Sequence, residues 1–292
     1  MTRKGIILAG GSGTRLYPIT KVVSKQLMPV YDKPMIYYAL STLMLSDIRD
    51  VLVISTPNDI NRFEELLGDG SKFGINIQYE IQKEPNGLPE SFLIGKDFIN
   101  NNLCTLILGD NIFYGNALSS ILLSASCKKN GASIFAYHVN DPSRYGVVEF
   151  SENKRIKTIE EKPKNPKSNF AITGLYYFDD NVHEIAQQIK PSERGELEII
   201  DVIKAYHHVK TLDVEILPRG YTWLDTGTHA SLLEASRFVS TIQNRQGLMV
   251  GCPEEIAYRK NWINADELLK IAQNYSNNRY GKYLNDLISI IE

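Results

Sequence analysis

Short apolar segments rich in β-branched residues recur along the first half of the chain, and segments of helical periodicity separate them. Several of the apolar segments have no polar face, which is typical of parallel strands that helices cover on both sides. Strands that alternate with helices predict an α/β fold with a doubly wound, mostly parallel sheet. The expected strands are Gly5–Ala9, Val51–Thr56, Ile75–Ile81, Leu103–Leu108 and Ala132–Val139, and the expected helices are Pro34–Ser46, Asp59–Leu67, Glu90–Asn100 and Asn116–Lys129.

After Tyr145 the pattern changes to short, closely spaced strands, which predict antiparallel pairs at an edge of the main sheet. No linker, repeat or low-complexity tract divides the chain, so we expect one compact domain over residues 1–243 and a helical addition over residues 244–292. The expected strands of this half are Val147–Phe150, Ile156–Glu160, Ala171–Phe178 and Tyr221–Leu224, and the expected helices are Val182–Ile189, Leu197–His207 and His229–Gln243.

Composition and charge exclude several classes of function. Lysine and arginine number 32 against 34 acidic residues, and no basic block occurs, which argues against a nucleic-acid surface. No apolar run approaches the ~20 residues of a membrane span, so we expect a soluble, cytoplasmic protein with no membrane segment. Three cysteines without CxxC spacing and five scattered histidines argue against disulfides and against a zinc site.

A glycine-rich loop, Gly10 to Gly13, directly follows the first expected strand. Three glycines in four residues would let a phosphate approach backbone N–H groups, although the loop lacks both a complete dinucleotide fingerprint and the GK[ST] ending of a P-loop. A tight turn would use the same glycines, so the loop alone leaves both interpretations open. Arg15 and Lys25 lie on the same connection and favour the phosphate site.

The stretch Gly10–Pro34 (GGSGTRLYPITKVVSKQLMPVYDKP) resembles the signature of the sugar-1-phosphate nucleotidyltransferases, and is close to that of their thymidylyl-transferring members. The resemblance implies a Rossmann-like fold and an Mg²⁺-dependent transfer from dTTP to α-D-glucose 1-phosphate. The products would be pyrophosphate and dTDP-glucose, the starting point of dTDP-L-rhamnose synthesis. Further matching segments are Leu108–Asn111 (LGDN), Tyr145–Phe150 (YGVVEF), Glu160–Pro163 (EEKP), Lys167–Tyr176 (KSNFAITGLY), Arg194–Ile199 (RGELEI), Trp223–His229 (WLDTGTH) and Leu232–Ser236 (LLEAS).

The resemblance also implies roles for individual residues. The expected catalytic residues are Arg15, Lys25, Asp110 and Lys162, and the expected Mg²⁺ ligands are Asp110 and Asp225. Residues that match the nucleotide site are Gly10, Gly11, Ser12, Gly13, Thr14, Arg15, Gln82, Gly87 and Leu88. Residues that match the sugar-phosphate site are Asn111, Gly146, Glu161, Lys162, Ile172, Gly174, Tyr176 and Glu196.

Most of these residues also have an ordinary structural explanation. Asp110 or Asp225 would serve equally well in a turn or a helix cap, and Glu196 as an acid at a helix start. A surface lysine beside a glutamate, such as Lys162 beside Glu161, is usually a solvated pair. Because Pro163 follows Lys162, we expect extended backbone at this lysine.

The segment after Gln82 departs from the family pattern. A glutamine amide offers a donor and an acceptor, which suits the N3–H and O4 edge of thymine or uracil. Where the family has GLAQAF, this chain has Gly87-Leu88-Pro89-Glu90-Ser91-Phe92, which adds a carboxylate near an anionic ligand. A smaller departure is Ile200, where the family often has threonine.

The reaction needs no general base from the protein, because a sugar phosphate has a second pKa near ~6 and its oxygen is already an anionic nucleophile at neutral pH. Alignment of that oxygen with the α-phosphorus and neutralisation of charge would suffice. Two alternatives remain open: an enzyme that uses UTP or another hexose 1-phosphate, and a catalytically silent sensor of sugar nucleotides.

The segment Gly251–Arg259 (GCPEEIAYR) resembles the family's assembly and regulatory region. The resemblance implies a homotetramer and a second site for dTDP-L-rhamnose, in which Arg259 would bind the diphosphate. The alternative is that Arg259 is a solvated surface residue. The expected regulatory residues are Leu45, Tyr114, Gly115, Glu255, Ile256 and Arg259.

Overall fold

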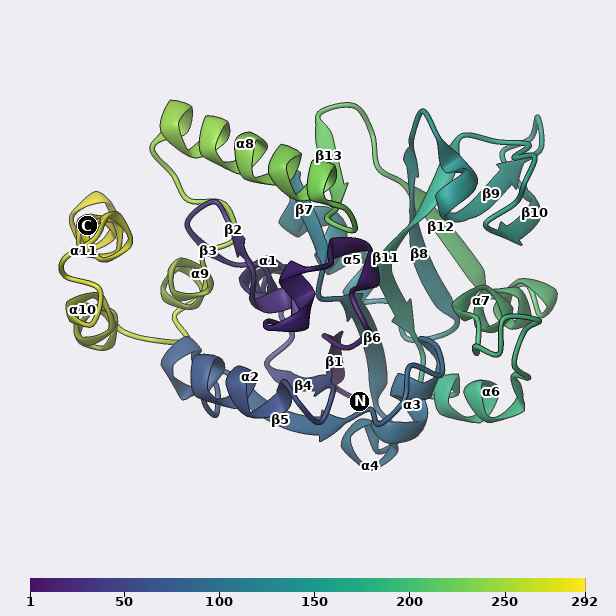
Figure 1. Ribbon diagram of the computed structural model, residues 1–292, viewed down its shortest axis with the longest axis horizontal. Helices are drawn as coiled ribbons and strands as arrows, with labels where there is room; N and C mark the ends of the chain where they lie inside the picture. The colour runs from purple at the N-terminus through teal and green to yellow at the C-terminus, as the bar shows by residue number, and fades with distance from the viewer. Residues whose placement is uncertain (292) are drawn as a thin grey trace.

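A nine-stranded mixed sheet runs through the centre of the computed structural model, which describes residues 1–291 (Figure 1). Its parallel half consists of four neighbours at the positions that apolar patterning predicts, and confirms the doubly wound arrangement. In sheet order these strands are β5 (Asn76–Ile81), β4 (Asp50–Ser55), β1 (Arg3–Leu8) and β6 (Leu103–Leu108).

The other half of the sheet is mostly antiparallel and centres on one long strand, β11 (Phe170–Phe178). β11 is antiparallel to β6 and also to β8 (Ala132–His138), so β8 lies outside the parallel set in which its apolar sequence placed it. β9 (Gly146–Phe150) and β10 (Ile156–Glu161) form an antiparallel arm, as expected. β12 (Leu212–Ile216), which pairs in parallel with β8, was not expected because charged residues interrupt it.

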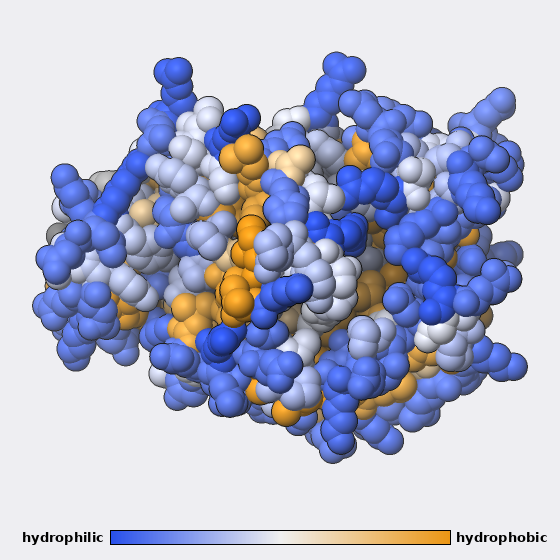
Figure 2. Space-filling model, in the orientation of Figure 1, coloured by the Kyte–Doolittle hydropathy of each residue, from blue (hydrophilic) through white to orange (hydrophobic). Residues whose placement is uncertain are grey.

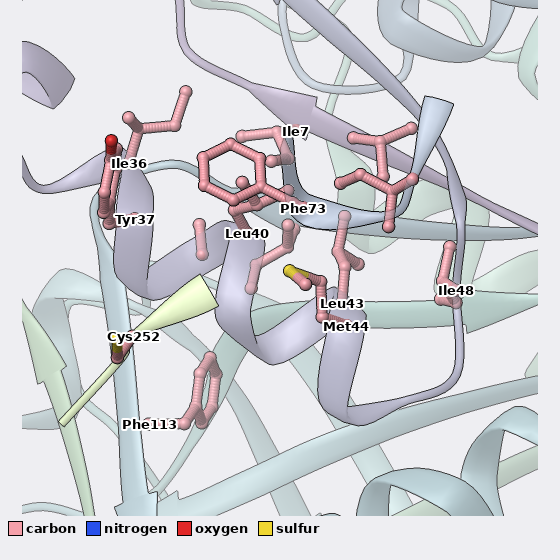
Figure 3. Close-up of a cluster of buried hydrophobic side chains, with 14 of the residues drawn as sticks. Ile7, Ile36, Tyr37, Leu40, Leu43, Met44, Ile48, Phe73, Phe113 and Cys252 are labelled. Atoms are coloured by element: carbon pink, nitrogen blue, oxygen red, sulfur yellow. The ribbon is translucent and has the colours of Figure 1, made fainter. Parts of the chain in front are cut away.

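Helices cover both faces of the sheet, and successive residues of β1 point to opposite cores. Ile7 packs with α1 (Ile36–Leu45), whereas its neighbour Ile6 packs with helices on the other face. Figure 3 shows the side chains of α1 gathered around Ile7 and Phe73. The helices of the first face are α1, α2 (Ile60–Leu67) and α5 (Leu118–Ser126), and those of the second are α3 (Glu90–Ile94), α4 (Lys96–Ile99), α6 (Val182–Gln188) and α7 (Ile199–His208). The single helix expected over residues 90–100 is divided at Gly95.

A two-stranded ribbon stands apart from the main sheet. β7 (Asn111–Gly115) pairs antiparallel with β13 (Tyr221–Asp225), and Asp225 lies opposite Asn111. A second, shorter ribbon pairs β2 (Pro29–Val30) with β3 (Lys33–Pro34). The ribbon of β7 and β13 therefore joins two segments that are distant in the sequence, at the edge where several strands end.

The C-terminal part is helical, as expected. α8 (His229–Gln246) starts with a capping box between Thr228 and Ser231 and ends at Gly247, whose positive φ terminates the helix. Residue 243 lies within α8, and the proposed division after it stays a prediction. Three further helices extend the core around α1 through Ala257, Leu268 and Leu284. These helices are α9 (Pro253–Arg259), α10 (Ala265–Gln273) and α11 (Arg279–Ile291).

The visible surface is mostly hydrophilic, with hydrophobic residues mainly in a band left of centre and along the lower edge (Figure 2). Within residues 1–291, no helix is both long and apolar enough to cross a membrane. α10 and α11 lie at the far end of the long axis from β9 and β10 (Figure 1).

Candidate active site

Two adjoining cavities, of about 320 and 170 Å³, open at the carboxyl ends of the parallel strands. Gly10 follows β1, Gln82 follows β5 and Asp110 follows β6, so the fold brings all three to one edge. Ligands of doubly wound sheets bind at this edge. Arg15, Leu88 and Asp110 line both cavities and form the boundary between them.

The glycine loop forms one wall of the first cavity. Gly11 and Gly13 have φ of 101° and 58°, which favour glycine. A Cβ atom at Gly13 would also lie 2.9 Å from Cγ2 of Thr20, whose hydroxyl donates a hydrogen bond of 2.7 Å to the Gly13 carbonyl. The loop therefore keeps its backbone close to the cavity. All the residues expected at the nucleotide site line this cavity, together with Lys25: Gly10, Gly11, Ser12, Gly13, Thr14, Arg15, Gln82, Gly87 and Leu88.

The segment after Gln82 is held against the chain near Glu196. A Cβ atom at Gly87 would lie 2.1 Å from the carbonyl oxygen of Leu197, so only glycine allows this approach. The Leu197 N–H donates a 2.7 Å hydrogen bond to the carbonyl of Asn86. Glu196, expected at the sugar phosphate, lines the first cavity and not the second.

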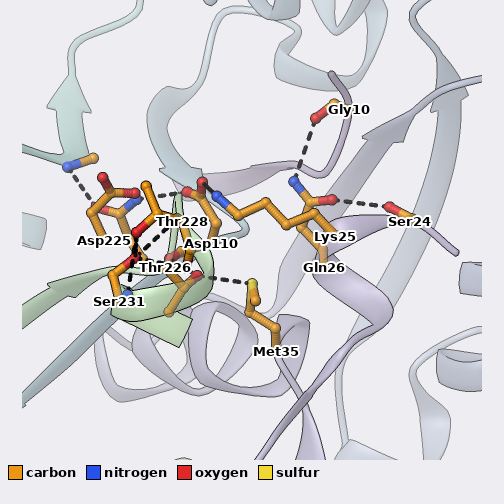
Figure 4. A network of polar contacts seen from close by, with 12 residues as sticks. Gly10, Ser24, Lys25, Gln26, Met35, Asp110, Asp225, Thr226, Thr228 and Ser231 are labelled. Atoms are coloured by element: carbon orange, nitrogen blue, oxygen red, sulfur yellow. Dashed lines mark hydrogen bonds and ion pairs between the residues drawn. The ribbon is translucent and has the colours of Figure 1, made fainter. Parts of the chain in front are cut away.

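Asp110 lies at the junction of the cavities within a dense polar network (Figure 4). The Lys25 ammonium forms an ion pair with Asp110 Oδ2, and Asn111 Nδ2 donates to Asp110 Oδ1 at 2.8 Å. The Thr226 hydroxyl donates to the Asp110 carbonyl at 2.9 Å, which links the end of β13 to this residue. Asp110 is thus fixed from three directions, and both of its carboxylate oxygens have polar partners.

Asp225 approaches Asp110 because β13 pairs with β7. Burial raises the pKa of the Asp225 carboxyl, and the charge of Asp110 raises it further, while Lys25, Arg15 and Arg144 act in the opposite direction. The Arg144 guanidinium is 3.7 Å from Asp225 Oδ2. Two partly buried carboxylates side by side repel each other, and a cation between them would relieve that repulsion.

The chemistry of this pair fits Mg²⁺. Magnesium prefers oxygen ligands and usually takes one or two carboxylates, with phosphate and water completing its shell. Within residues 1–291, no group of three or more His, Cys, Asp or Glu side chains has metal-binding geometry. Asp110 and Asp225 would therefore supply only part of a shell, which leaves positions for substrate oxygens.

The second cavity is lined by seven of the eight residues expected to bind the sugar phosphate. Lys162 Nζ lies 3.2 Å from Glu161 Oε1, and about half of the lysine side chain is exposed. The expectation of extended backbone at Lys162 is wrong, because its φ is 41°, in the left-handed region that costs a side chain free energy. A hydrogen bond of 3.0 Å from the Lys162 N–H to the Tyr145 carbonyl holds this conformation. The seven residues are Asn111, Gly146, Glu161, Lys162, Ile172, Gly174 and Tyr176.

Asn111 connects the ribbon to the main sheet. Its Oδ1 accepts hydrogen bonds from the Gly174 N–H at 3.0 Å and from Trp223 Nε1 at 2.6 Å. These donors require the amide oxygen at this position, so the NH₂ group must face Asp110. The orientation of Asn111 is therefore set by three segments of the chain.

Sequence reasoning missed several residues that line the two cavities, among them Gln26, Arg144 and Trp223. Gln26 lines the first cavity and donates weakly to the Gly10 carbonyl at 3.4 Å. Arg144 lines the second cavity beside Asp225, and the indole of Trp223 orients Asn111. A signal existed only for Arg144, a cation directly before the Tyr145–Phe150 segment.

A separate cavity of about 300 Å³ lies among α1, β7 and α9. The Arg259 guanidinium donates from Nε to Glu255 Oε1 at 2.7 Å, and the Tyr283 hydroxyl donates to Glu255 Oε2 at 2.6 Å. All six residues expected at a regulatory site line this cavity: Leu45, Tyr114, Gly115, Glu255, Ile256 and Arg259.

Comparison with known sequences identifies close relatives. The sequence profile described as "Nucleotidyl transferase" matches residues 4–242. The chain is 56% identical to a glucose-1-phosphate thymidylyltransferase of Xanthomonas campestris, over 98% of this chain and 97% of the relative. It is 52% identical to the protein of that name from Mycobacterium tuberculosis, over 98% and 99% of the two chains.

Solved structures give the same picture. A Bacillus anthracis protein described as a glucose-1-phosphate thymidylyltransferase, in complex with sucrose, superposes with a TM-score of 0.75 at 40% identity, over 81% of this chain and 95% of the other. A UDP-glucose pyrophosphorylase in complex with UDP-glucose superposes with a TM-score of 0.70 at 25% identity, over 83% of this chain and all of the other.

Proposed function

The chain belongs to the nucleotidyl transferase family, and on that premise we propose that it transfers a thymidylyl group from dTTP to α-D-glucose 1-phosphate, releasing pyrophosphate and forming dTDP-glucose. The observation that carries the proposal is the pair of adjoining cavities that share Arg15 and Asp110. One cavity has a glycine loop for phosphates and an amide for a base, and the other has Lys162 beside sugar-sized space.

The residues of the boundary align and neutralise the reacting groups. The phosphate oxygen of glucose 1-phosphate attacks the α-phosphorus of dTTP, the bond from that phosphorus to the bridging oxygen breaks, and pyrophosphate carries away the electron pair. Arg15 and Lys25 offset the negative charge on the triphosphate side, and Lys162 holds the sugar phosphate. Asp110 and Asp225 would hold Mg²⁺, which when bound neutralises phosphate charge.

The same site supports a choice of base, and the biological role belongs to the proposal. Gln82 would read an edge that thymine and uracil share, and the 5-methyl group adds only about 1 kcal/mol in an apolar contact, so UTP should be used more slowly than dTTP but measurably. The product would enter dTDP-L-rhamnose synthesis. We place the enzyme in the cytoplasm, where its nucleoside triphosphate substrate is made.

We also propose a homotetramer with feedback inhibition by dTDP-L-rhamnose. Support comes from the convergence of the six expected regulatory residues on one cavity between the main domain and α9. Arg259 lies at that cavity, where its Nε donates to Glu255 and its two terminal NH₂ groups would bind a diphosphate. A monomer in light scattering at micromolar concentration would contradict the tetramer.

The test of the reaction is pyrophosphate release over a panel of nucleotides and sugar phosphates. We expect the highest kcat/KM with dTTP and glucose 1-phosphate, in the presence of Mg²⁺. A higher kcat/KM with UTP or with another hexose 1-phosphate would correct the substrate. Binding of dTDP-glucose without turnover of any pair would instead favour the silent sensor.

A further inference from the structure

Glu90 contacts the amide that would read the base. Gln82 lies directly after β5, is buried, and lines the first cavity. Its Nε2 donates to Glu90 Oε2 at 2.6 Å and to the Gly87 carbonyl at 3.3 Å. The second oxygen of Glu90 accepts from Asn86 Nδ2 at 2.8 Å. Both carboxylate oxygens are thus used to fix amide groups of this segment.

These contacts decide which end of the Gln82 amide faces the cavity. A carboxylate only accepts hydrogen bonds, so the Gln82 atom 2.6 Å from it must be the NH₂ group. Oε1 then lies on the other side of the amide, close to Gly10. A Cβ atom added to Gly10 would lie only 3.2 Å from Gln82 Oε1. Within residues 1–291, Oε1 receives no hydrogen bond from the protein, and Gly10 lines the same cavity. The protein therefore presents an acceptor to the nucleotide.

An acceptor at this point distinguishes the pyrimidines. Thymine and uracil carry an N–H at N3 and can donate to Gln82 Oε1, whereas N3 of cytosine is itself an acceptor. If the amide turned over, its NH₂ group would face the base and suit cytosine instead. The reversed amide would also turn Oε1 toward the Glu90 carboxylate, where two acceptors would face each other without a hydrogen bond, so the carboxylate opposes this reversal.

We propose that Glu90 is a positioning residue for base selection, which holds the Gln82 amide in the orientation that accepts thymine or uracil and rejects cytosine. The inference rests on the proposed function and specifies a determinant of its nucleotide site. Glu90 stands where the family pattern has glutamine, and a neutral amide there could pair with Gln82 in either orientation. A charged acceptor makes one orientation strongly favoured.

The test uses Glu90→Gln, which keeps the size of the side chain and removes its charge. We measure kcat/KM with dTTP and with dCTP, and compare their ratio, because any general effect of charge on triphosphate binding cancels in it. We expect the preference for dTTP to fall about tenfold relative to the wild type, since a neutral partner no longer excludes the reversed amide. A ratio within about threefold of the wild-type value would overturn the proposal.

The matched control is Glu84→Gln, which removes a charge from the same loop. Glu84 is exposed, and the Gln82 amide donates its hydrogen bonds to Gly87 and Glu90 and none to the Glu84 carboxylate. We expect its dTTP to dCTP ratio to equal that of the wild type, and an equal fall in both variants would show that charge, not contact, is responsible. Thermal unfolding of Glu90→Gln checks that α3 is intact.

A binding measurement separates this inference from the reaction itself. If the wild-type chain released no pyrophosphate from any pair, the proposed function would fail. Calorimetric Kd values for dTDP and dCDP would still test Glu90, because they require no turnover. Loss of the dTDP preference in Glu90→Gln alone supports the inference, and an unchanged preference rejects it.

Discussion

The active-site cleft and the cavity beside α9 share a wall, since β7 contributes Asn111 to the first and Tyr114 and Gly115 to the second. They differ in how their charges are arranged. In the cleft, Asp225 lies beside Asp110, and that neighbour helps to raise the pKa of Asp225. In the cavity beside α9, Glu255 and Arg259 satisfy each other one helical turn apart.

This difference shows which charged pair stabilises the fold and which one does not. An ion pair at i and i+4 stabilises its own helix, although by only a few tenths of a kcal/mol. Two adjacent carboxylates repel each other, and because Lys25, Arg15 and Arg144 leave the pKa of Asp225 raised, the pair is typical of a ligand site. The charges of the cleft are therefore the stronger evidence for a functional site. The case for a ligand in the cavity beside α9 rests more on the shape of the cavity and on Arg259.

The largest expected effect of a substitution in the cleft is at Asp225. Asp225→Asn should lower kcat in pyrophosphate release about 10³-fold, because one charged oxygen ligand and its attraction for the metal are lost. The fold should persist, since the substitution removes repulsion from Asp110 and keeps the shape. Asp213→Asn, at an exposed ion pair with Lys128, is the control and should leave kcat unchanged. A kcat of Asp225→Asn within about tenfold of the wild type would remove this residue from the metal site.

Lys162 tests the sugar-phosphate half of the cleft. Lys162→Ala should raise KM for glucose 1-phosphate about 30-fold, because a charged hydrogen-bond donor to the phosphate is lost. Lys167 is an exposed lysine near Glu160 on the following segment and serves as the matched control. Equal KM values for Lys162→Ala and Lys167→Ala would refute the assignment.

Arg259 tests the other side of the comparison. Arg259→Ala should weaken inhibition by dTDP-L-rhamnose about tenfold at saturating dTTP, since the diphosphate loses its bidentate partner. The control is Arg237→Ala, at an exposed position of α8, which dTDP-L-rhamnose should inhibit as strongly as it inhibits the wild type. Inhibition that is purely competitive with dTTP, and that Arg259→Ala does not alter, would place the inhibitor in the cleft.

Glu254, next to Glu255 in α9, is fully buried close to the cavity beside that helix, and burial raises the pKa of its carboxyl. The Tyr280 hydroxyl donates to Glu254 Oε2 at 2.5 Å, whereas Oε1 has no partner within the described residues. A raised pKa in the folded state means that protonation favours folding. The titratable or charged groups that face Glu254 are Tyr37, Lys72, Cys252, Tyr275 and Tyr280.

The smallest expected effect is therefore on stability. The wild type should lose stability as pH rises from the ordinary range of a glutamate through the raised pKa of Glu254. Glu254→Gln removes this dependence and should melt about 2 °C above the wild type at pH 7.5, with the gap closing toward pH 4. Melting curves at both pH values measure it. A constant gap would mean that Glu254 does not titrate in this range.

Much of the fold and of the cleft could be predicted from local sequence. β1, β4 and β6 lie within two residues of the expected strands because each contains a continuous apolar run, and β5 does so because apolar and polar residues alternate along it. Parallel strands place their following loops at one edge, so the glycine loop, Gln82 and Asp110 could be expected together.

The rest depends on pairing between distant segments, which no local pattern records. β7 was missed because the Gly109 to Asn111 turn residues hide its start, and its partner β13 lies more than a hundred residues later. The role of Trp223 follows only from that pairing. The left-handed backbone of Lys162 and the contact between Glu90 and Gln82 likewise arise from neighbours that tertiary structure supplies.

The pairing of β7 with β13 also determines when, during synthesis, Asp110 and Asp225 can come together. Thr226 and Asp110 are 116 residues apart, yet their hydrogen bond closes the ribbon at the carboxylate pair. During synthesis, β1, β4, β5 and β6 are made well before β13, so they can begin to assemble before Asp225 has been added to the chain. The entropic cost of closing a loop grows only slowly with its length, so the long separation between β7 and β13 adds little to the free energy of their pairing. An incomplete chain that ends before β13 would have the glycine loop but only one of the two carboxylates that we propose to hold Mg²⁺, so we expect it to be inactive.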